Sequence, residues 1–424
     1  MHYFKVQSIY FIGMSPIKVE VPAWEWYGDC AEELEFPDGW NINEQRMAGH
    51  DARSLSKKEM EEKLQHPVGT PTLSELAKGK TKCVIIFDDM TRPTKTWQML
   101  PAVLDELEKG GVDRDGIRFV MATGAHGARM LPDFRKKLGE EIPERFLVFN
   151  HNPYENLVEL GETSHGTPVH INREVMDCDL KISVAALIPH FGYGFGGGAK
   201  ILLPGVAGIE TIWHNHRIRE GVGPGRIASN TRRLDSEEAA KMAGLDFVVN
   251  AILNPGRDVA DLVCGDVVEA HREGVKLGRR HYATPVAPEA DISIGNGYPM
   301  ANEGYKAYRI AVESVREGGD LVFLIYTPEG SRVHYYNGRF GEGYGGRGWR
   351  PDVYVGKPWR MGRVLAVTPH LMKADEPYYG DGSIWVKTWE EALRLLKEAH
   401  GSEADVALYP CAAMQISEQN AAAK

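Results

Sequence analysis

IPHFGYGFGGGAKILLPGVAGIETIWHNH, residues 188–216, is the stretch from which the fold and the site of this chain are inferred. A glycine run in it ends in Lys200, and histidines stand before and after that run. Glycines let the backbone approach a ligand closely and accept positive φ, and consecutive N–H groups in such a loop bind anions, most often phosphate. Lysine adds an amine that can bond to an electrophilic cofactor, and imidazoles supply proton transfer or a metal ligand. The stretch therefore predicts a loop that binds a cofactor and carries out chemistry.

Short apolar runs on either side of polar loops predict the strands of an α/β fold. We expect strands at residues 82–87, 117–123, 146–150 and 179–186, and a helix over 96–109 that ends at Gly110–Gly111. Strands that alternate with helices predict βαβ units and a mostly parallel, Rossmann-like sheet. Each strand precedes a polar loop: DDMTRPT (88–94), TGAH (123–126), NHNPYEN (150–156) and residues 188–200. Because ligands bind beyond the carboxyl ends of parallel strands, we expect the four loops to form one site.

The rest of the chain predicts a second, smaller α/β unit. We expect helices at 265–280, 302–316 and 388–399, strands at 291–296, 320–326 and 363–368, and a long loop over 327–361. Residues 17–80 read as one strand followed by mixed helix and loop, and the strand at 405–408 is expected to return to the first sheet. The resulting prediction is an N-terminal domain of residues 14–275 plus 400–424 and a C-terminal domain of residues 276–399. We expect the tail after Gln415 to fray.

Composition excludes several classes of protein. The chain has 424 residues, 43% of them hydrophobic and 25% charged, which is typical of a globular protein. Its formal net charge of −10 argues against nucleic acid or an anionic membrane as partners. Five scattered cysteines without a C-x-x-C pair predict a reducing, cytoplasmic compartment. No apolar run is long enough for a membrane span, the N-terminus lacks the pattern of a signal peptide, and residues 1–13 read as a loose extension before Met14.

Four pieces of this sequence, taken in order, carry a family resemblance: DDMTRPT, TGAH, IPHFGYGFGGGAKILLPG and ETIWHNH. The chain resembles the nickel-dependent lactate racemase family over nearly its whole length from Met14 onward. That resemblance implies two α/β domains with the site in the cleft between them. It also implies a nickel-pincer nucleotide, a pyridinium mononucleotide whose ring carbon and two sulfur groups hold nickel. The enzymes that build this cofactor are implied partners.

The resemblance assigns expected roles to individual residues. Lys200 matches the lysine that forms a thioamide link to the cofactor, His216 matches the nickel-ligating histidine, and His126 and His190 match the two acid–base histidines. The remaining expected cofactor contacts are Asp89, Thr91, Gly196, Gly197 and Gly198. The substrate contacts are expected from Arg92, Tyr305, Lys306 and Arg309. The implied reaction moves a hydride from Cα of a 2-hydroxy acid to the pyridinium while a histidine removes the hydroxyl proton.

The chain departs from the lactate-type pattern at positions that would hold the substrate. Gly127-Ala128 follow His126 where the lactate enzymes tend to carry Arg-Pro. Lys306 and Arg309 replace the Gln and Lys of the Tyr-Gln-x-x-Lys pattern that begins at Tyr305. Three basic residues, counting Arg92, exceed what one carboxylate needs. We therefore expect a 2-hydroxy acid larger than lactate, such as a sugar acid or a dicarboxylate.

Other interpretations of the same residues remain open at this point. Lys200 could be a simple phosphate-binding charge, Arg92 a surface ion-pair partner, and Lys306 part of a solvated helix face. His214 lies two residues before His216 and would face another side of a helix, so an outer or surface position is expected. The spacing fits neither a nucleoside triphosphatase nor a diffusible-NAD enzyme. A metal-assisted hydro-lyase on the same scaffold and a non-catalytic nucleotide-binding protein are the alternative functions. Trp349 and Trp359 are candidates for covering the cofactor.

Overall fold

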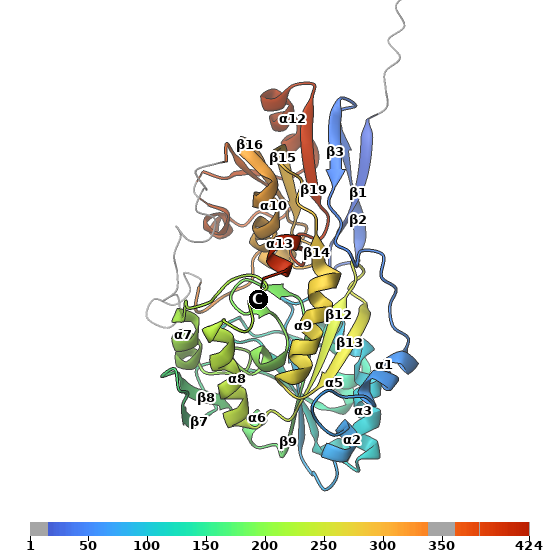
Figure 1. Cartoon of the computed structure of the whole chain (residues 1–424), viewed down its shortest axis with the longest axis vertical. Helices are drawn as coiled ribbons and strands as arrows, with labels where there is room; N and C mark the ends of the chain where they lie inside the picture. The colour runs from blue at the N-terminus through green and yellow to red at the C-terminus, as the bar shows by residue number, and fades with distance from the viewer. Residues whose placement is uncertain (1–15, 338–360, 381, 424) are drawn as a thin grey trace, which may run out of the picture.

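Two six-stranded sheets organise the chain, one in each lobe of the molecule in Figure 1. The structure is a computed structural model that describes residues 16–337, 361–380 and 382–423. The predictions for residues 1–13, Trp349 and Trp359 concern residues outside these ranges. Among the described residues, no helix combines the length and the apolar character that crossing a bilayer requires.

The first sheet has the strand order β13-β12-β9-β4-β5-β6. All neighbours in it are parallel except β12 and β13, which form an antiparallel pair. The four strands predicted in this region are confirmed as β4, β5, β6 and β9, whereas β12 and β13 were not predicted. The bounds are β4 Cys83–Asp88, β5 Ile117–Ala122, β6 Leu147–Asn150, β9 Leu180–Ala186, β12 Phe247–Leu253 and β13 Val259–Gly265.

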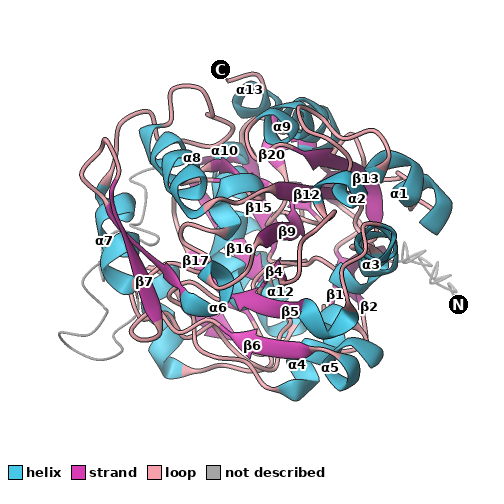
Figure 2. Cartoon of the chain, turned by 90° about the horizontal axis from the view of Figure 1, so that it is seen from below, coloured by secondary structure: helices cyan, strands magenta, loops and turns pink. Residues whose placement is uncertain are grey.

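Helices cover both faces of the first sheet, as Figure 2 shows. Successive residues of a strand point to opposite faces, and β4 follows this rule because Ile85 and Phe87 enter one core while Val84 and Ile86 enter the other. Helices α1, α2 and α3 pack on the first face, and α6, α7 and α8 on the second. Their bounds are α1 Lys57–Leu64, α2 Leu73–Leu76, α3 Leu100–Lys109, α6 Arg173–Met176, α7 Ile209–Arg217 and α8 Thr231–Ala243.

The second sheet is parallel throughout, with the order β18-β17-β16-β15-β19-β3. It takes in two strands that the sequence analysis grouped with the first unit. The strand near 405–408 is β19, and it pairs with β15 and β3 instead of returning to the first sheet. The bounds are β3 Trp40–Glu44, β15 Ala290–Asn296, β16 Val315–Leu324, β17 Val364–Val367, β18 Ile384–Val386 and β19 Ala404–Tyr409.

The segment 17–44 belongs with the second lobe for a packing reason. It forms three strands and not the single one expected, since β1 (Ile17–Ala23) and β2 (Cys30–Phe36) make a hairpin ahead of β3. Val21 and Leu34 of this hairpin share one core with Ile292 of β15 and with α12 (Trp389–His400). On the other face of the second sheet, α10 (Tyr308–Ser314) packs against β16. The hydrophobic face of the hairpin is therefore covered by the second sheet.

Shorter elements complete the fold. The helix expected over 302–316 is instead a 3₁₀ segment, Ala301–Ala307, followed by α10, and β16 already begins at Val315. The tail does not fray over the described residues, because β20 pairs with β14 and α13 follows it. The bounds are α4 Leu131–Leu138, α5 Glu141–Arg145, β7 Leu157–Glu162, β8 Pro168–Asn172, β10 Pro189–His190, β11 Gly194–Phe195, α9 Glu269–Tyr282, β14 Ala283–Thr284, β20 Ile416–Ser417 and α13 Glu418–Ala421.

Candidate active site

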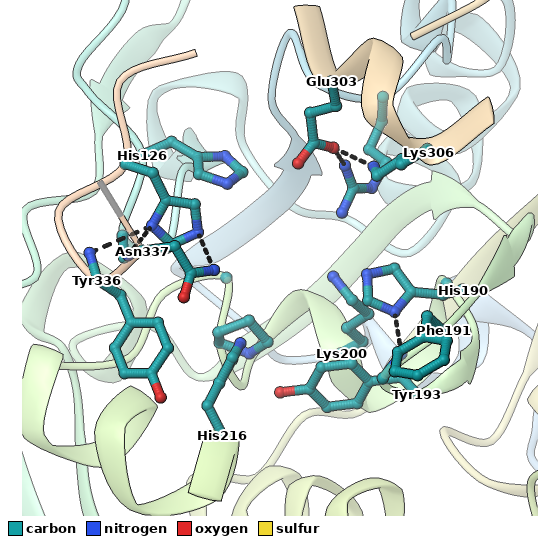
Figure 3. Close-up of a pocket in the computed structure, with 18 of the residues that line it drawn as sticks. His126, His190, Phe191, Tyr193, Lys200, His216, Glu303, Lys306, Tyr336 and Asn337 are labelled. Carbon is teal, nitrogen blue, oxygen red and sulfur yellow. Dashed lines mark hydrogen bonds and ion pairs between the residues drawn. The ribbon is translucent and has the colours of Figure 1, made fainter. Parts of the chain in front are cut away.

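A cavity of about 810 Å³ lies between the two lobes. Three of the four predicted loops line it, namely those that follow β4, β5 and β9. The fourth loop, after β6, is not among the lining residues that the structure describes, because β6 is the edge strand of the first sheet. The second lobe contributes the 3₁₀ segment 301–307, α10 and residues 332–337. In the view of Figure 3, His126 and His190 lie on opposite sides, with Lys200 and His216 below and Glu303 above.

His126 is held by a buried carboxylate from the neighbouring strand. Its Nδ1 donates to Oδ2 of Asp89 at 2.6 Å, and Oδ1 of Asp89 accepts the Thr91 hydroxyl at 2.6 Å. Burial would raise the pKa of Asp89, but the contact with His126 and the charge of Arg92 hold it below its usual range. Burial also lowers the pKa of His126, an effect that Asp89 opposes. His126 is therefore a neutral imidazole whose Nε2 carries a lone pair, while Thr91 lies behind the cavity wall.

His190 is held in the opposite tautomer. The backbone N–H of Gly192 donates to His190 Nδ1 at 3.1 Å, so the proton of the neutral ring sits on Nε2. Burial, together with the charge of Lys200, lowers the pKa of His190 well below its usual range. The ring meets Tyr193 edge-on, with centroids 5.5 Å apart. The two expected acid–base histidines thus line one cavity, one with a lone pair at Nε2 and the other with an N–H.

Two of the N–H groups that the sequence predicted for a phosphate cradle are engaged within the protein. Gly196 N donates to Ile188 O at 2.7 Å, and Gly198 N donates to the Asn250 side chain at 2.9 Å, so neither N–H is available to a phosphate. Glycine is required here for space: a Cβ on Gly197 would lie 2.5 Å from Asn250 Oδ1, and φ is +67°. Gly196 and Gly197 line the cavity, whereas Gly198 packs against His271 behind it.

Lys200 follows the glycine run in a 3₁₀ segment, Gly198–Ile201, and its side chain lines the cavity. The Nζ atom lies 5.2 Å from the centroid of the Tyr193 ring. Burial, together with the charge of Arg92, lowers the pKa of Lys200 to about 7. A substantial fraction of this amine is therefore unprotonated near neutral pH, the state in which lysine acts as a nucleophile.

His216 lies near the carboxyl end of α7 and lines the cavity, whereas His214 is exposed, as their spacing on one helix predicted. The Nδ1 atom of His216 is buried close to the backbone of Ile212, four residues earlier in the helix, but makes no hydrogen bond of good geometry. Burial, with the charge of Arg232, lowers the pKa of His216 well below its usual range, so the ring keeps a lone pair. The described residues contain no group of three or more His, Cys, Asp or Glu side chains arranged to hold a metal ion. A metal on His216 would therefore take its other ligands from elsewhere.

The basic residues predicted to grip substrate are largely engaged by Glu303, which the sequence analysis missed. Arg92 Nη1 donates to Glu303 Oε2 at 2.8 Å, and Lys306 Nζ pairs with the same oxygen. Arg332 Nε lies 2.7 Å from Glu303 Oε1, which also accepts the Tyr305 hydroxyl at 3.1 Å. Burial would raise the pKa of Glu303, but these cations hold it well below its usual range. Of the three basic residues that were expected to exceed the need of one substrate carboxylate, Arg92 and Lys306 are therefore already paired with a protein carboxylate.

Arg309 is the exception among the predicted cations. Its guanidinium stacks over the Phe191 ring at 5.3 Å and lines the cavity. Within residues 16–337, 361–380 and 382–423 it makes no hydrogen bond or ion pair. Arg309 is thus positioned to accept an anionic group from a ligand.

Several lining residues carried no signal in the sequence. Glu303 lies in the unremarkable run ANEGYK, and Arg332, His334, Tyr336 and Asn337 come from the predicted long loop. Tyr336 packs over His216 with ring centroids 5.2 Å apart. It therefore lies where a residue could cover the cofactor, the role for which the sequence offered Trp349 and Trp359.

The cavity residues fit a lysine-linked, metal-bearing mononucleotide. Lys200 supplies an amine of lowered pKa, and His216 supplies a buried imidazole nitrogen that makes no hydrogen bond of good geometry. The volume of about 810 Å³ lies within the usual range for a small-molecule cofactor site. The fit does not extend to a phosphate cradle made by Gly196 and Gly198.

Known proteins resemble this chain in sequence. A model of the lactate racemase N-terminal domain matches residues 27–222. The lactate racemase of Thermoanaerobacterium thermosaccharolyticum is 28% identical over 325 residues, which cover 74% of this chain and 75% of that protein. The lactate racemase of Lactiplantibacillus plantarum is 32% identical over 288 residues, covering 65% of this chain and 68% of that protein.

Solved structures share the fold. The lactate racemase apoprotein of T. thermosaccharolyticum superposes with a TM-score of 0.70 at 23% identity, covering 95% of this chain and all of that one. A Thermotoga maritima protein gives a TM-score of 0.61 at 18% identity, with coverages of 85% and 97%.

The two-sheet fold, the paired histidines and the racemase relatives define an α/β enzyme of the isomerase class. The chain belongs to the lactate racemase family.

Proposed function

We propose that this enzyme is a racemase or epimerase of a 2-hydroxy acid that works with a nickel-pincer nucleotide linked to Lys200. The observation that carries the proposal is the pair of neutral histidines in opposite tautomers, one on each side of a cavity that also holds the Lys200 amine. A reaction that inverts one carbon needs proton-transferring groups on both faces of that carbon. The alternatives of a hydro-lyase or a pure nucleotide binder do not call for this pairing.

Two residues would hold the cofactor. Lys200 would carry the covalent link, since its lowered pKa leaves the amine able to attack, and His216 would ligate nickel through a ring nitrogen. When bound, the cofactor would supply a hydride acceptor for the substrate Cα. The linked nitrogen of Lys200 is uncharged, so linkage also removes one of the charges that lower the pKa of His190.

The histidines would move the hydroxyl proton. Nε2 of His126 accepts the proton of the C2 hydroxyl, and Asp89 stabilises the resulting imidazolium through Nδ1. His190 presents its Nε2–H from the other side. It gives this proton to the C2 oxygen after the ring has taken up a proton from solvent, while His126 releases its own proton to solvent, so the proton count is unchanged. Arg309 pairs with the substrate carboxylate, because Arg92 and Lys306 already pair with Glu303.

The substrate is proposed to be larger than lactate. The support comes from the shape of the cavity, which reaches past Arg309 to Glu313 and to Asn420 of α13. Asn420 Nδ2 donates to Glu313 Oε1 at 3.1 Å, so this end of the cavity offers polar groups to a substrate tail. A negative group at this end would meet the carboxyl group of Glu313, so a hydroxylated tail such as that of a sugar acid suits it better than a second carboxylate.

The test uses protein produced together with the cofactor-synthesis enzymes, which we propose as its partners in the cytoplasm. Intact mass should reveal a mononucleotide adduct that the Lys200→Ala variant lacks. The loaded enzyme is then incubated in deuterated water with a panel of lactate, larger 2-hydroxy monocarboxylic acids, sugar acids and hydroxy dicarboxylic acids. Epimerised product that keeps the original hydrogen on Cα supports hydride shuttling. A bare mass from a competent host, or complete deuteration at Cα, contradicts the proposal.

A further inference from the structure

Residues 332–337, here called the strap, carry a third histidine into the cavity from the second lobe. A β-bridge joins His334 to His126. Gly127 N donates to Val333 O at 3.2 Å, and Tyr335 N donates to Ala125 O at 2.7 Å. The strap is therefore fixed by backbone hydrogen bonds to the same loop that carries His126.

The sequence of that loop allows this close approach. A Cβ added to Gly127 would lie 3.3 Å from Cβ of Val333, which is tight for any side chain. A residue without a Cβ at position 127 thus makes room for the strap. Gly127, which stands where the lactate enzymes tend to carry Arg, thus lets His334 lie beside His126.

The imidazole of His334 is fixed in one tautomer. Its Nδ1 accepts the backbone N–H groups of Tyr336 at 3.2 Å and Asn337 at 3.1 Å. In the neutral ring the proton therefore lies on Nε2. The atom 3.4 Å from Nε2 is the amide nitrogen Nδ2 of Asn337, which is a donor and cannot accept the Nε2–H, so this hydrogen is left for an acceptor in the cavity. Figure 3 shows Tyr336 and Asn337 on the His126 side of the cavity.

His334 and His126 form a complementary pair. The ring centroids lie 4.8 Å apart in an edge-to-face arrangement, and both rings line the cavity. His126 carries a lone pair on Nε2, and His334 carries an N–H there. Burial, with the charge of Arg332, lowers the pKa of His334 well below its usual range, so the ring stays uncharged.

We infer that His334 is a further catalytic residue, which donates its Nε2–H to the C2 oxygen of the bound 2-hydroxy acid while His126 removes the proton from that oxygen. This inference rests on the proposed function. As the hydroxyl loses its proton, negative charge develops on the oxygen, and an N–H donor already in place stabilises it. His334 takes the donor role because His126 beside it keeps the lone pair on Nε2 that accepts the proton, whereas Nε2 of His334 carries a hydrogen.

Two substitutions separate the donor from its structural role. His334→Asn retains an acceptor near the position of Nδ1 for the two backbone N–H groups but has no donor near Nε2. His334→Gln places an amide N–H near Nε2 and loses the Nδ1 acceptor. Val333→Ala, at an exposed side chain of the strap, controls for general disturbance of the segment.

We expect His334→Asn to lower kcat/KM of the loaded enzyme by about 10²-fold, as for loss of one donor to a developing oxyanion, and His334→Gln to recover at least tenfold of that loss. Val333→Ala should remain near wild type. Near-wild-type kcat/KM in His334→Asn would overturn the inference. So would a His334→Gln variant as impaired as His334→Asn, since a donor restored near Nε2 would then recover no activity.

A second readout does not depend on turnover. Cofactor-free protein labelled with ¹⁵N-histidine should give a resonance, absent in His334→Asn, that reports the Nε2–H tautomer at neutral pH and shifts on adding lactate. An Nδ1–H tautomer overturns the inference. An enzyme that epimerises no 2-hydroxy acid while this resonance behaves as expected refutes the proposed function instead.

Discussion

Asp89 Oδ2 lies 2.6 Å from Nδ1 of His126, and the side chains are 4% and 14% exposed, respectively. They come from the ends of adjacent parallel strands, β4 and β5, whose register pairs Asp88 with Ala122. The carboxylate fixes the tautomer and the orientation of the ring, so that the lone pair of Nε2 is directed away from Asp89. Proton acceptance by His126 therefore depends on a residue that need not touch the substrate.

Replacing Asp89 with Asn should reduce kcat by about 10²-fold or more, the scale of a disabled general base. Burial already lowers the pKa of His126, and Asp89 opposes that shift. The wild-type acid limb of kcat/KM should therefore lie below the ordinary histidine value, and in Asp89→Asn it should move to lower pH still. The measurement is a pH profile of both proteins with equal cofactor loading. If the acid limb of kcat/KM in Asp89→Asn moved toward neutral pH, Asp89 would not raise the pKa of His126.

Lys200 of the cofactor-free protein should react at pH 7 to a larger extent than its ordinary pKa would allow. With a pKa of about 7, about half of this amine is neutral at that pH, against roughly one in three thousand for an ordinary lysine. Peptide mapping after brief acetylation at pH 7, 8 and 9 would measure this, with Lys58, whose side chain is 84% exposed, as the comparison. The ratio of Lys200 to Lys58 labelling should rise as the pH falls. A constant ratio would exclude the lowered pKa.

Nickel content should separate two histidines that lie two residues apart. His216→Ala removes the imidazole that lines the cavity, whereas His214→Ala changes an exposed side chain on the same helix. Metal analysis of loaded protein should give little nickel in the first variant and a wild-type amount in the second, while the mass adduct on Lys200 persists in both. Equal nickel content in the two variants would remove the assignment of His216.

Much of the first lobe could be predicted from the sequence because its buried parallel strands are apolar runs that end in polar loops. The same reason applies to five site residues. Four of them lie in loops after strands, and the fifth lies in the helix that follows one of these loops: Asp89, His126, His190, Lys200 and His216. Their shared cavity results from the parallel order of β9, β4 and β5.

Of the second lobe, Tyr305, Lys306 and Arg309 were predicted and line the cavity, but Glu303 and residues 332–337 were not, because their place depends on contacts between distant segments. Glu303 meets Arg92 across 211 positions, and the bridge between His126 and His334 joins two lobes. The hairpin β1–β2 was misassigned because its alternating pattern does not reveal which sheet will cover it. For the glycine run, sequence shows where an N–H can be exposed, and not whether a protein acceptor already takes it, as happens at Gly196 and Gly198.

Arg309 should matter more for substrate affinity than Lys306. Arg309→Gln removes the cation that has no ionic partner among the described residues, and a charge-assisted hydrogen bond is worth about 1.5–3 kcal/mol, so KM should rise about tenfold or more. Lys306→Gln should raise KM by a smaller factor, because Glu303 already neutralises Lys306. Steady-state kinetics on the best acid of the panel would compare them. If Lys306→Gln raised KM more than Arg309→Gln does, the substrate carboxylate would replace Glu303 as the partner of Lys306.

Replacing Glu303 with Gln should destabilise the folded protein by about 3–5 kcal/mol, because Arg92, Lys306 and Arg332 are left buried without their carboxylate. The pKa of Glu303 is lowered in the folded state, so its contribution is fully present above the unfolded value of about 4.3 and is lost as the pH falls toward the folded value. Urea unfolding of both proteins between pH 7 and pH 3 would measure this. The gap in unfolding free energy should be widest at neutral pH and should narrow below pH 4.3. A gap that widens on acidification would mean that Glu303 is protonated in the native cluster and that Arg92 and Lys306 are free to bind a substrate carboxylate.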